Sequence, residues 1–516
     1  MKQVWKLFTR LSPLGLGVLV VVDVLVGVVF RFSTTSKLWL DEALGVNIAQ
    51  GSPSQIVERL RDDGAPPLYY LILHYWMKVF GTSDFAVRAL SGVAATLVLG
   101  AVFLLARRLW GLKAGFLALS VVAVTPYAVY FGTETRMYAL VMLESTTLLY
   151  LWVGDWTQHT KRRIALTAVA ATALLYTHYW ALYFLFVLGV TALAQIVASR
   201  SLSSENRLKL LALAAGFVAW LPWFPIFNEQ RIHTGTPWAT PPPFYQFLTW
   251  LDGIVTNQSR QHVTASLHSV LTLLCFIAIL VLGLLALRMH DRAVIELDVR
   301  VPREVRFIAF VGLGTVVVGM TAAHFGSTTF VPRYAAVAVI PVLLIAVRGI
   351  QVLDKTWRIL LVLFLISGLS LWTDRWGRIV QRTQAGQVAA VLDSAPAGSY
   401  VFFCPDQLGP STMRYSRPDV TYKGYPRYDN PQIVNWYDYK QAFGRTSPQA
   451  AGRFVAKDAG PRDIYIVWAS GYTLKSTCRS VVNEVAVATG RSPEKLLKAK
   501  LTGFYQSMNV TYFGAP

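Results

Sequence analysis

Two adjacent carboxylates, Asp41 and Glu42, lie in the stretch LWLDEALGVNIAQG, shortly after the end of a long apolar run. The pattern around them predicts an amphipathic helix on a membrane surface, with both carboxylates at its start. Backbone N–H groups in the first turn of a helix stabilise an ionised carboxylate. An ionised carboxylate held in place is what a general base needs. Asp41 is therefore our candidate base.

Other titratable residues lie beside the ends of later apolar runs. A single carboxylate in such a place is usually just solvated. Several titratable groups at the mouth of one helical bundle indicate a site instead. The residues concerned are Asp63, Glu134, Arg136, His178 and Arg333.

The composition is that of a protein that crosses a membrane many times. The chain has 516 residues, of which 54% are hydrophobic and only 15% charged. Its net charge of +20 comes from Lys and Arg at the ends of apolar runs, which is a topology signal. No basic stripe or base-reading motif is present, so we expect no nucleic-acid partner.

The apolar runs predict about eleven transmembrane helices. Basic residues gather in alternate loops, which places the N-terminus in the cytoplasm and the carboxylates named above outside the cell membrane. An odd number of helices also places the C-terminal part outside. The predicted spans are residues 13–31, 86–106, 114–131, 137–153, 164–177, 180–198, 208–227, 268–287, 307–323, 334–348 and 357–373.

After residue 376 the apolar runs stop, so we divide the chain into a membrane domain, 1–376, and a soluble extracytoplasmic domain, 377–516. Strand-like runs at 399–404 and 463–469 alternate with helix-like runs at 447–457 and 477–489, which predicts an α/β fold. The role of this domain is open between a binding or docking module and a simple cap.

The cysteines of the soluble part and a carboxylate in the first span allow two further predictions. Cys404 and Cys478 lie in the soluble part, and an oxidising compartment would join them in a disulfide. Asp23 lies in the middle of the first span, where an ionisable group is costly. It is far from the outer mouth, so we interpret it as a polar contact inside the bundle.

Four motifs, in this order along the chain, carry a family resemblance: WLDEA, DGAPPLYYLILHYW, AVRALSG and ETRMYAL. They resemble the polyprenyl-phosphate-sugar glycosyltransferases of the GT-C type, family 39, which include protein O-mannosyltransferases and lipid A aminoarabinose transferases. The resemblance covers roughly the first 200 residues well. It implies a GT-C helical bundle, an Asp–Glu pair at Asp41 and Glu42, and a role for Arg88 in holding the donor phosphate.

The chemistry implied by this resemblance gives each residue a role. An inverting transfer needs a base for the acceptor hydroxyl, which is Asp41, and positive charge for the departing phosphate. Arg suits bidentate contact with phosphate oxygens. Arg88, Arg136, His178 and Arg333 are therefore candidates to bind the donor phosphate, and Glu42, Asp63, Glu134 and Tyr138 to bind acceptor or sugar.

Alternatives remain for several of these residues. Glu42, Glu134 and His178 would also serve as ligands of a divalent cation, and we expect no other cofactor. Arg88 and Arg333 would serve equally as lipid headgroup anchors, and Glu134 with Arg136 as a local ion pair. His178 would also suit an interfacial position without a catalytic role.

The expected donor is a polyprenyl-phosphate sugar, with mannose ahead of arabinofuranose. The acceptor is a hydroxyl on a cell-envelope glycan, lipid or protein. A transporter or lipid flippase is the competing class, although such proteins usually place their site near the midplane and contain repeats. A non-catalytic scaffold that binds wall polymer is the third hypothesis.

Overall fold

The computed structural model describes residues 2–158, 160–200, 203–234, 242–256, 267–290, 294–298, 301–326, 330–417, 419–470, 476–500 and 504–516. Its contacts divide the chain into two compact units, which we describe separately. Unit 1 comprises residues 1–34, 88–225 and 241–378, and unit 2 comprises residues 35–87, 226–240 and 379–516.

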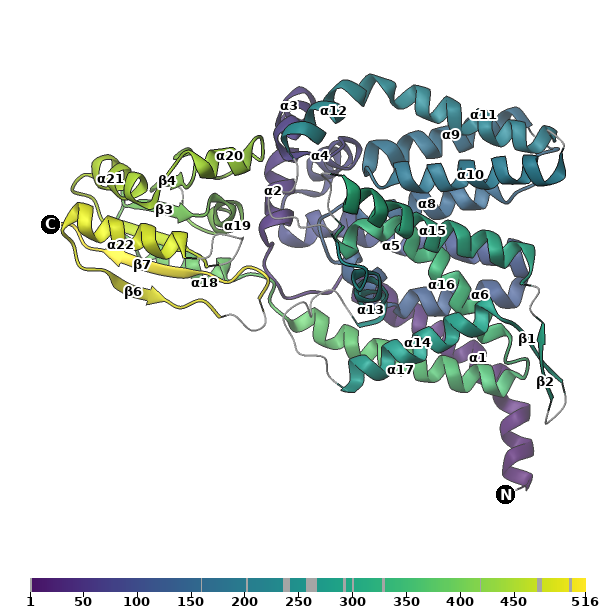
Figure 1. Ribbon diagram of the computed structural model, residues 1–516. Coiled ribbons are helices and arrows are strands. Elements are labelled where there is room, and N and C mark those ends of the chain that lie inside the picture. Colours follow the sequence, from purple (N-terminus) through teal and green to yellow (C-terminus); the bar gives the residue numbers. More distant parts are fainter. Residues whose placement is uncertain are drawn as a thin grey trace. The chain divides into compact units, whose positions relative to one another are not determined.

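Unit 1 is a helical bundle with one short β-hairpin (Figure 1). The hairpin joins α14 to α15 and consists of β1 (Ala286–His290) and β2 (Val294–Asp298). Two helices, α5 and α17, begin or end a few residues outside the unit. The helices are α1 (Lys2–Arg31), α5 (Asp84–Trp110), α6 (Leu112–Val124), α7 (Pro126–Gly132), α8 (Tyr138–Trp152), α9 (Thr160–Thr177), α10 (Ala181–Ser199), α11 (Ser204–Trp220), η1 (Leu221–Trp223), α13 (Gln246–Thr256), α14 (Leu267–Leu284), α15 (Arg303–Phe325), η3 (Pro332–Ala335), α16 (Ala336–Gln351) and α17 (Thr356–Ile379).

Each of the eleven predicted spans is helical, but fewer are long and apolar enough to cross a membrane. Among the described residues, eight helices meet that test, or nine if the bent pair α6 and α7 forms one span. Two of the predicted spans do not meet it, because α8 has only 15 residues and α9 begins with the polar TKRR. The protein is a multi-pass membrane protein.

Helix α16 lies at the centre of unit 1. It packs against α6, α8, α14 and α15. The most apolar part of the segment from Pro332 to Gln351 is 83% buried, whereas the corresponding parts of the other seven spans are buried to between 17% and 50%. Protein therefore surrounds α16, while the other spans leave much of their surface for lipid.

Asp23 joins three helices inside the bundle. Its side chain is fully buried and accepts hydrogen bonds from Ser120 of α6 and from Ser367 Oγ of α17, the latter at 2.8 Å. A buried charge or polar group needs such partners to be tolerated at membrane depth. The interpretation of Asp23 as a contact inside the bundle is confirmed.

Arg31, at the end of α1, stabilises a break between α6 and α7. Pro126 has no N–H, so the carbonyl of Val122 loses its usual helical partner. The Arg31 guanidinium donates to Val122 O at 2.8 Å and to Ala123 O at 2.6 Å. The two helices consequently bend by 60° without leaving these carbonyls unsatisfied. Gly27 permits the approach, since a Cβ there would lie 2.2 Å from Ala123 O.

Unit 2 contains a five-stranded sheet and several helices (Figure 1). The strand order is β4-β3-β5-β7-β6, in which β4, β3 and β5 are parallel and β7 is antiparallel to its neighbours. The elements are α2 (Leu40–Ala49), α3 (Pro53–Asp63), α4 (Leu68–Phe80), α12 (Phe224–His233), α18 (Ala385–Asp393), β3 (Tyr400–Cys404), η4 (Asp406–Leu408), α19 (Gly409–Met413), β4 (Thr421–Gly424), α20 (Tyr439–Gly444), α21 (Pro448–Ala459), β5 (Ile464–Trp468), α22 (Thr477–Thr489), β6 (Glu494–Leu497) and β7 (Asn509–Phe513).

Helices cover both faces of this sheet. On one face, Val455 of α21 and Val481 of α22 pack against Phe402 and Ile466 of the central strands. On the other face, Val388 and its neighbours on α18 pack against Val401, Phe403 and Val467. Because side chains alternate along a strand, the adjacent residues of β3 serve the two faces in turn. The predicted α/β fold of the C-terminal part is confirmed, and both predicted strands and both predicted helices are present.

The segment 35–87 belongs to the same compact unit as this sheet. Asn47 Nδ2 donates to Gln432 O at 2.7 Å, and Asn435 Nδ2 donates to Asp62 Oδ2 at 2.8 Å. The segment 226–240 is joined to the same unit through Gln230, whose Nε2 donates to Leu60 O at 2.7 Å. The sequence-based division at residue 376 does not coincide with this grouping, because contacts between distant segments decide it.

Cys404 and Cys478 form a disulfide that joins the end of β3 to the start of α22. The two cysteines are 74 residues apart and completely buried, so the bond restricts a long loop of the unfolded chain. We expect the double substitution of both cysteines by serine to lower the free energy of unfolding of this domain by about 2–5 kcal/mol. Thermal unfolding of the purified protein, with and without reductant, measures the loss.

Alkylation under denaturing conditions, followed by mass spectrometry, checks the pairing. Without reductant, the free thiol of Cys275 is expected to react and the other two cysteines to remain unmodified. Alkylation of Cys404 and Cys478 without reductant would contradict the disulfide.

Candidate functional site

In unit 1, three turns between helices bring basic and aromatic residues together. Glu134 and Arg136 lie between α7 and α8, His178 lies between α9 and α10, and Arg333 lies in η3. The imidazole of His178 is between two tyrosine rings, with centroid distances of 5.9 Å to Tyr138 and 5.5 Å to Tyr334. The structure thus gathers residues that the sequence assigned to one site.

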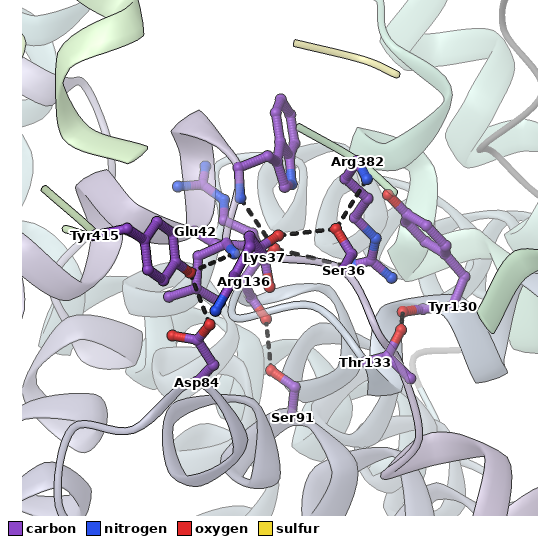
Figure 2. A network of polar contacts seen from close by, with 12 residues as sticks. Ser36, Lys37, Glu42, Asp84, Ser91, Tyr130, Thr133, Arg136, Arg382 and Tyr415 are labelled. Carbon is purple, nitrogen blue, oxygen red and sulfur yellow. Dashed lines mark hydrogen bonds and ion pairs between the residues drawn. The ribbon is translucent and has the colours of Figure 1, made fainter. Parts of the chain in front are cut away.

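Hydrogen bonds from neighbouring helices fix these turns. Ser91 Oγ of α5 donates to the carbonyl of Arg136 at 3.2 Å, and Thr133 Oγ1 donates to Tyr130 O at 2.8 Å (Figure 2). Tyr127 Oη of α7 donates to the carbonyl of Arg333 at 3.1 Å. Neighbouring helices therefore hold the backbone at both arginines. Each arginine side chain consequently starts from a fixed position.

Arg88 belongs to the same neighbourhood. It precedes Ser91 by three residues on α5, so the two side chains leave the same face of the helix. Arg88 is buried, as are Glu134, Tyr138 and His178. Unit 1 therefore brings Arg136 and Arg333 close to His178, with Arg88 on the face of α5 that holds the Arg136 backbone. Glu134 is the acidic residue of this region, since it acts on Tyr127 together with Arg333.

The electrostatics of this region favour an anion. Burial, together with the positive charges of Arg136 and Arg333, lowers the pKa of His178 to about 3. His178 is consequently neutral at physiological pH. Its Nδ1 accepts the Trp180 N–H at 3.2 Å, so the ring proton is on Nε2, which is left as a donor.

This low pKa makes a prediction about stability. Below pH 6.5 the unfolded chain binds a proton at His178 that the folded chain does not bind until about pH 3. Stability is therefore expected to fall as the pH decreases from 6.5 toward 3. A His178→Gln variant should have a shallower slope, by up to about 1.4 kcal/mol per pH unit.

Unfolding of the detergent-solubilised protein between pH 4 and 7.5 tests this slope. His324→Gln is the matched control, because His324 is an exposed histidine at the end of α15. Equal slopes for wild type and His178→Gln would mean that His178 titrates normally.

In unit 2, the acidic doublet opens helix α2 as predicted. Asp41 and Glu42 both lie in the first turn, and Asp41 is half-buried. Glu42 is completely buried, and its Oε2 accepts the backbone N–H of Trp39 at 3.4 Å and lies 3.7 Å from Arg382 Nη1. The Glu42 carboxylate thus already has structural contacts, and its role in binding acceptor or sugar stays a prediction.

Asp63 is also engaged by its own unit. Tyr70 Oη donates to Asp63 Oδ2 at 3.1 Å, which links the end of α3 to α4. The neighbouring Asp62 bonds to Asn435, and burial raises the pKa of Asp62. Asp63 remains a candidate for sugar binding that already has a structural contact.

The hypothesis of a metal ion at Glu42, Glu134 and His178 gains no support. Among the described residues there is no group of three or more His, Cys, Asp or Glu placed to hold a metal ion. The Glu42 carboxylate already pairs with the guanidinium of Arg382. The positive charges of two arginines act on His178 and would repel a metal cation there. A divalent metal ion at these residues stays a prediction.

Sequence reasoning missed Arg382, Tyr415 and Asp84. All three lie close to the start of α2 or to the end of the segment 35–87 (Figure 2). The available signal was an excess of arginines just after the last span, including Arg378 and Arg382. A partner in so distant a segment is not readable from spacing.

Comparisons with known proteins show similarity in sequence over part of the chain and in fold. Residues 64–226 match the family model described as dolichyl-phosphate-mannose-protein mannosyltransferase. ArnT from Cupriavidus metallidurans, bound to undecaprenyl phosphate, superposes with a TM-score of 0.59 at 12% identity over 96% of this chain and 97% of that one. The chain has the GT-C fold. The predicted GT-C helical bundle with a C-terminal α/β domain is confirmed.

The comparison with solved structures found further matches. The apo form of the same ArnT gives a TM-score of 0.53 at 13% identity, over 97% of this chain and 98% of that one. The match to the oligosaccharyltransferase of Archaeoglobus fulgidus, tethered with an acceptor peptide, covers 93% of this chain and 72% of that one at 11% identity, with a TM-score of 0.48. No curated protein matches the sequence.

Proposed function

We propose that the protein is a membrane glycosyltransferase that moves a sugar from a polyprenyl-phosphate donor to an acceptor hydroxyl. The observation that carries this proposal is that two half-buried arginines, Arg136 and Arg333, act on the buried, neutral imidazole of His178. Arginines bind phosphate oxygens through paired, charge-assisted hydrogen bonds, and a neutral imidazole adds one donor without charge repulsion. The similar ArnT structure is bound to undecaprenyl phosphate, a lipid phosphate of the kind that would leave in this reaction.

The proposed reaction proceeds with inversion. Asp41 removes the proton of the acceptor hydroxyl as the oxygen attacks the anomeric carbon of the sugar. The bond between this carbon and the phosphate oxygen breaks, and polyprenyl phosphate leaves with the electron pair. Arg88, Arg136 and Arg333 stabilise the negative charge on the phosphate, and His178 Nε2–H donates to it. Glu134 and Tyr138 bind the sugar or the acceptor.

Mannose is the proposed sugar, supported by the description of the matching family model. Arabinofuranose on the same lipid is the alternative. We propose a glycan, lipid or protein of the cell envelope as acceptor, with the reaction on the extracytoplasmic side where positive-inside loops would place it.

A donor panel tests the proposal. Membranes containing the protein are incubated with polyprenyl phosphates that carry radiolabelled mannose, arabinofuranose or other sugars, and label in lipid-free and lipid-linked products is counted. We expect label from mannose to enter an envelope fraction. Movement of intact donor across proteoliposomes, without any glycosylated product, would instead support a flippase.

A further inference from the structure

A buried ion pair joins helix α2 to the segment that follows the last span. Arg382 Nη1 lies 3.7 Å from Glu42 Oε2, and the two side chains are exposed to 2% and 0%. The backbone of Arg382 is also fixed, since its N–H donates to Ser36 Oγ at 2.8 Å (Figure 2). Its carbonyl accepts the N–H groups of Tyr505 and Gln506, each at 3.0 Å. Glu42 is thus tied to the C-terminal chain.

A tyrosine hydroxyl holds both ends of the segment that contains α2. Tyr415 Oη accepts the Leu38 N–H at 2.8 Å and donates to Asp84 Oδ2 at 2.7 Å (Figure 2). Arg414 Nε donates to the other carboxylate oxygen of Asp84 at 2.9 Å. Leu38 precedes α2, whereas Asp84 follows α4. The Tyr415 side chain therefore holds together the two ends of the segment that contains α2, α3 and α4.

These contacts surround Asp41 along the chain. On the N-terminal side of Asp41, the backbone of Leu38 bonds to Tyr415. On the C-terminal side of Asp41, Glu42 pairs with Arg382. In the last turns of α2, Asn47 Nδ2 donates to Gln432 O at 2.7 Å, and the helix packs against α19 of the C-terminal part. The orientation of α2 about its own axis is consequently fixed at both ends.

A domain that merely covered the membrane part would not need a buried ion pair. Desolvating two charges is expensive, and apolar residues of similar size often stabilise a protein at least as well. Directional hydrogen bonds and a buried pair instead select one orientation of the element that they hold. That is useful where a carboxylate must be held within a fraction of an ångström of its working position.

We propose that the C-terminal α/β domain is a clamp on helix α2, in which Arg382 and Tyr415 are positioning residues for Asp41. The inference rests on the proposed function, in which Asp41 is the base. Arg382 and Tyr415 act through α2 and take no part in proton transfer. The domain is then a component of the catalytic apparatus rather than a separate binding module.

The test uses the full-length protein in lipid nanodiscs with two readouts. Hydrogen exchange of the amides in residues 36–50 reports the clamp itself, independently of activity. Steady-state kinetics report positioning, because a displaced base lowers kcat while the donor KM stays constant. The variants are Arg382→Gln, Arg382→Lys and Tyr415→Phe, and Arg417→Gln is the control because Arg417 pairs with exposed Asp419 in the same domain.

For Arg382→Gln we expect faster exchange in residues 36–50 and a kcat about 100-fold lower, which is the loss that a misplacement of about 1 Å produces. The donor KM should change less than about threefold, and Arg382→Lys should recover part of kcat because it keeps the charge. Arg417→Gln should match the wild type. If Arg382→Gln does not fold, Tyr415→Phe gives the same test with a smaller change.

Unchanged exchange in residues 36–50 in both Arg382→Gln and Tyr415→Phe would overturn the clamp. Faster exchange with normal kcat would overturn the positioning role. If Asp41→Asn retains full activity while Arg382→Gln accelerates exchange, the proposed function fails and the clamp stands.

Discussion

Asp41→Asn is expected to lower the rate of sugar transfer by about 10²- to 10⁴-fold, the usual contribution of a general base. Asparagine has the same shape as aspartate but no basic oxygen that would take up the acceptor proton. The substitution should not disturb folding, because Asp41 is half-buried in the first turn of α2 and asparagine is well tolerated near helix N-termini. Initial rates with saturating donor and acceptor measure the loss.

The pH dependence gives this prediction a second measurement. The wild-type rate should decline at low pH as the base becomes protonated, and the residual rate of Asp41→Asn should lack that limb. Asp393→Asn is the matched control, because Asp393 is an exposed carboxylate at the end of α18. A normal transfer rate in Asp41→Asn would remove Asp41 from the mechanism.

The second large effect is expected for the two arginines of unit 1. Arg136→Gln and Arg333→Gln each remove charge-assisted hydrogen bonds to the donor phosphate, which are worth about 1.5–3 kcal/mol each. Donor affinity should therefore fall by roughly 10- to 100-fold for either variant, and kcat/KM should fall at least as much because the charge on phosphate increases in the transition state.

Inhibition by polyprenyl phosphate separates the effect on binding from the effect on kcat/KM. It measures the affinity for the leaving group in the absence of sugar transfer. Arg108→Gln is the control, because Arg108 is an exposed arginine near the other end of α5 and stacks on Tyr150 at 3.9 Å. Wild-type inhibition of both arginine variants would show that the phosphate binds elsewhere and that Arg333 is only a headgroup anchor.

Much of the architecture is readable from the sequence because it depends on local chemistry. Backbone groups in lipid must bond within their own segment, so a long apolar run specifies a helix wherever it lies in the chain. The buried strands at Tyr400–Cys404 and Ile464–Trp468 likewise follow from β-branched and aromatic residues in short runs. The disulfide also agreed with the prediction, since only two cysteines lie in the soluble part.

Other features depend on which segments meet, and the sequence alone does not determine this. Glu42 looks like a site residue in the motif WLDEA, but in the structure it is the buried partner of Arg382. Leu38 and Tyr415 bond to each other across 377 positions of sequence. The low pKa of His178 depends first on burial and then on two arginines from turns far apart in the chain.

The sequence by itself therefore determined the membrane helices, the α/β character of the C-terminal part and the residue types available for phosphate chemistry. Only the tertiary structure decided that the segment 35–87 is held by the C-terminal domain, and which acidic residues have structural partners. The physical reason is that hydropathy and strand propensity act over a few residues. Ion pairs, hydrogen bonds between segments and electrostatic shifts of pKa depend on distances that only the folded chain sets.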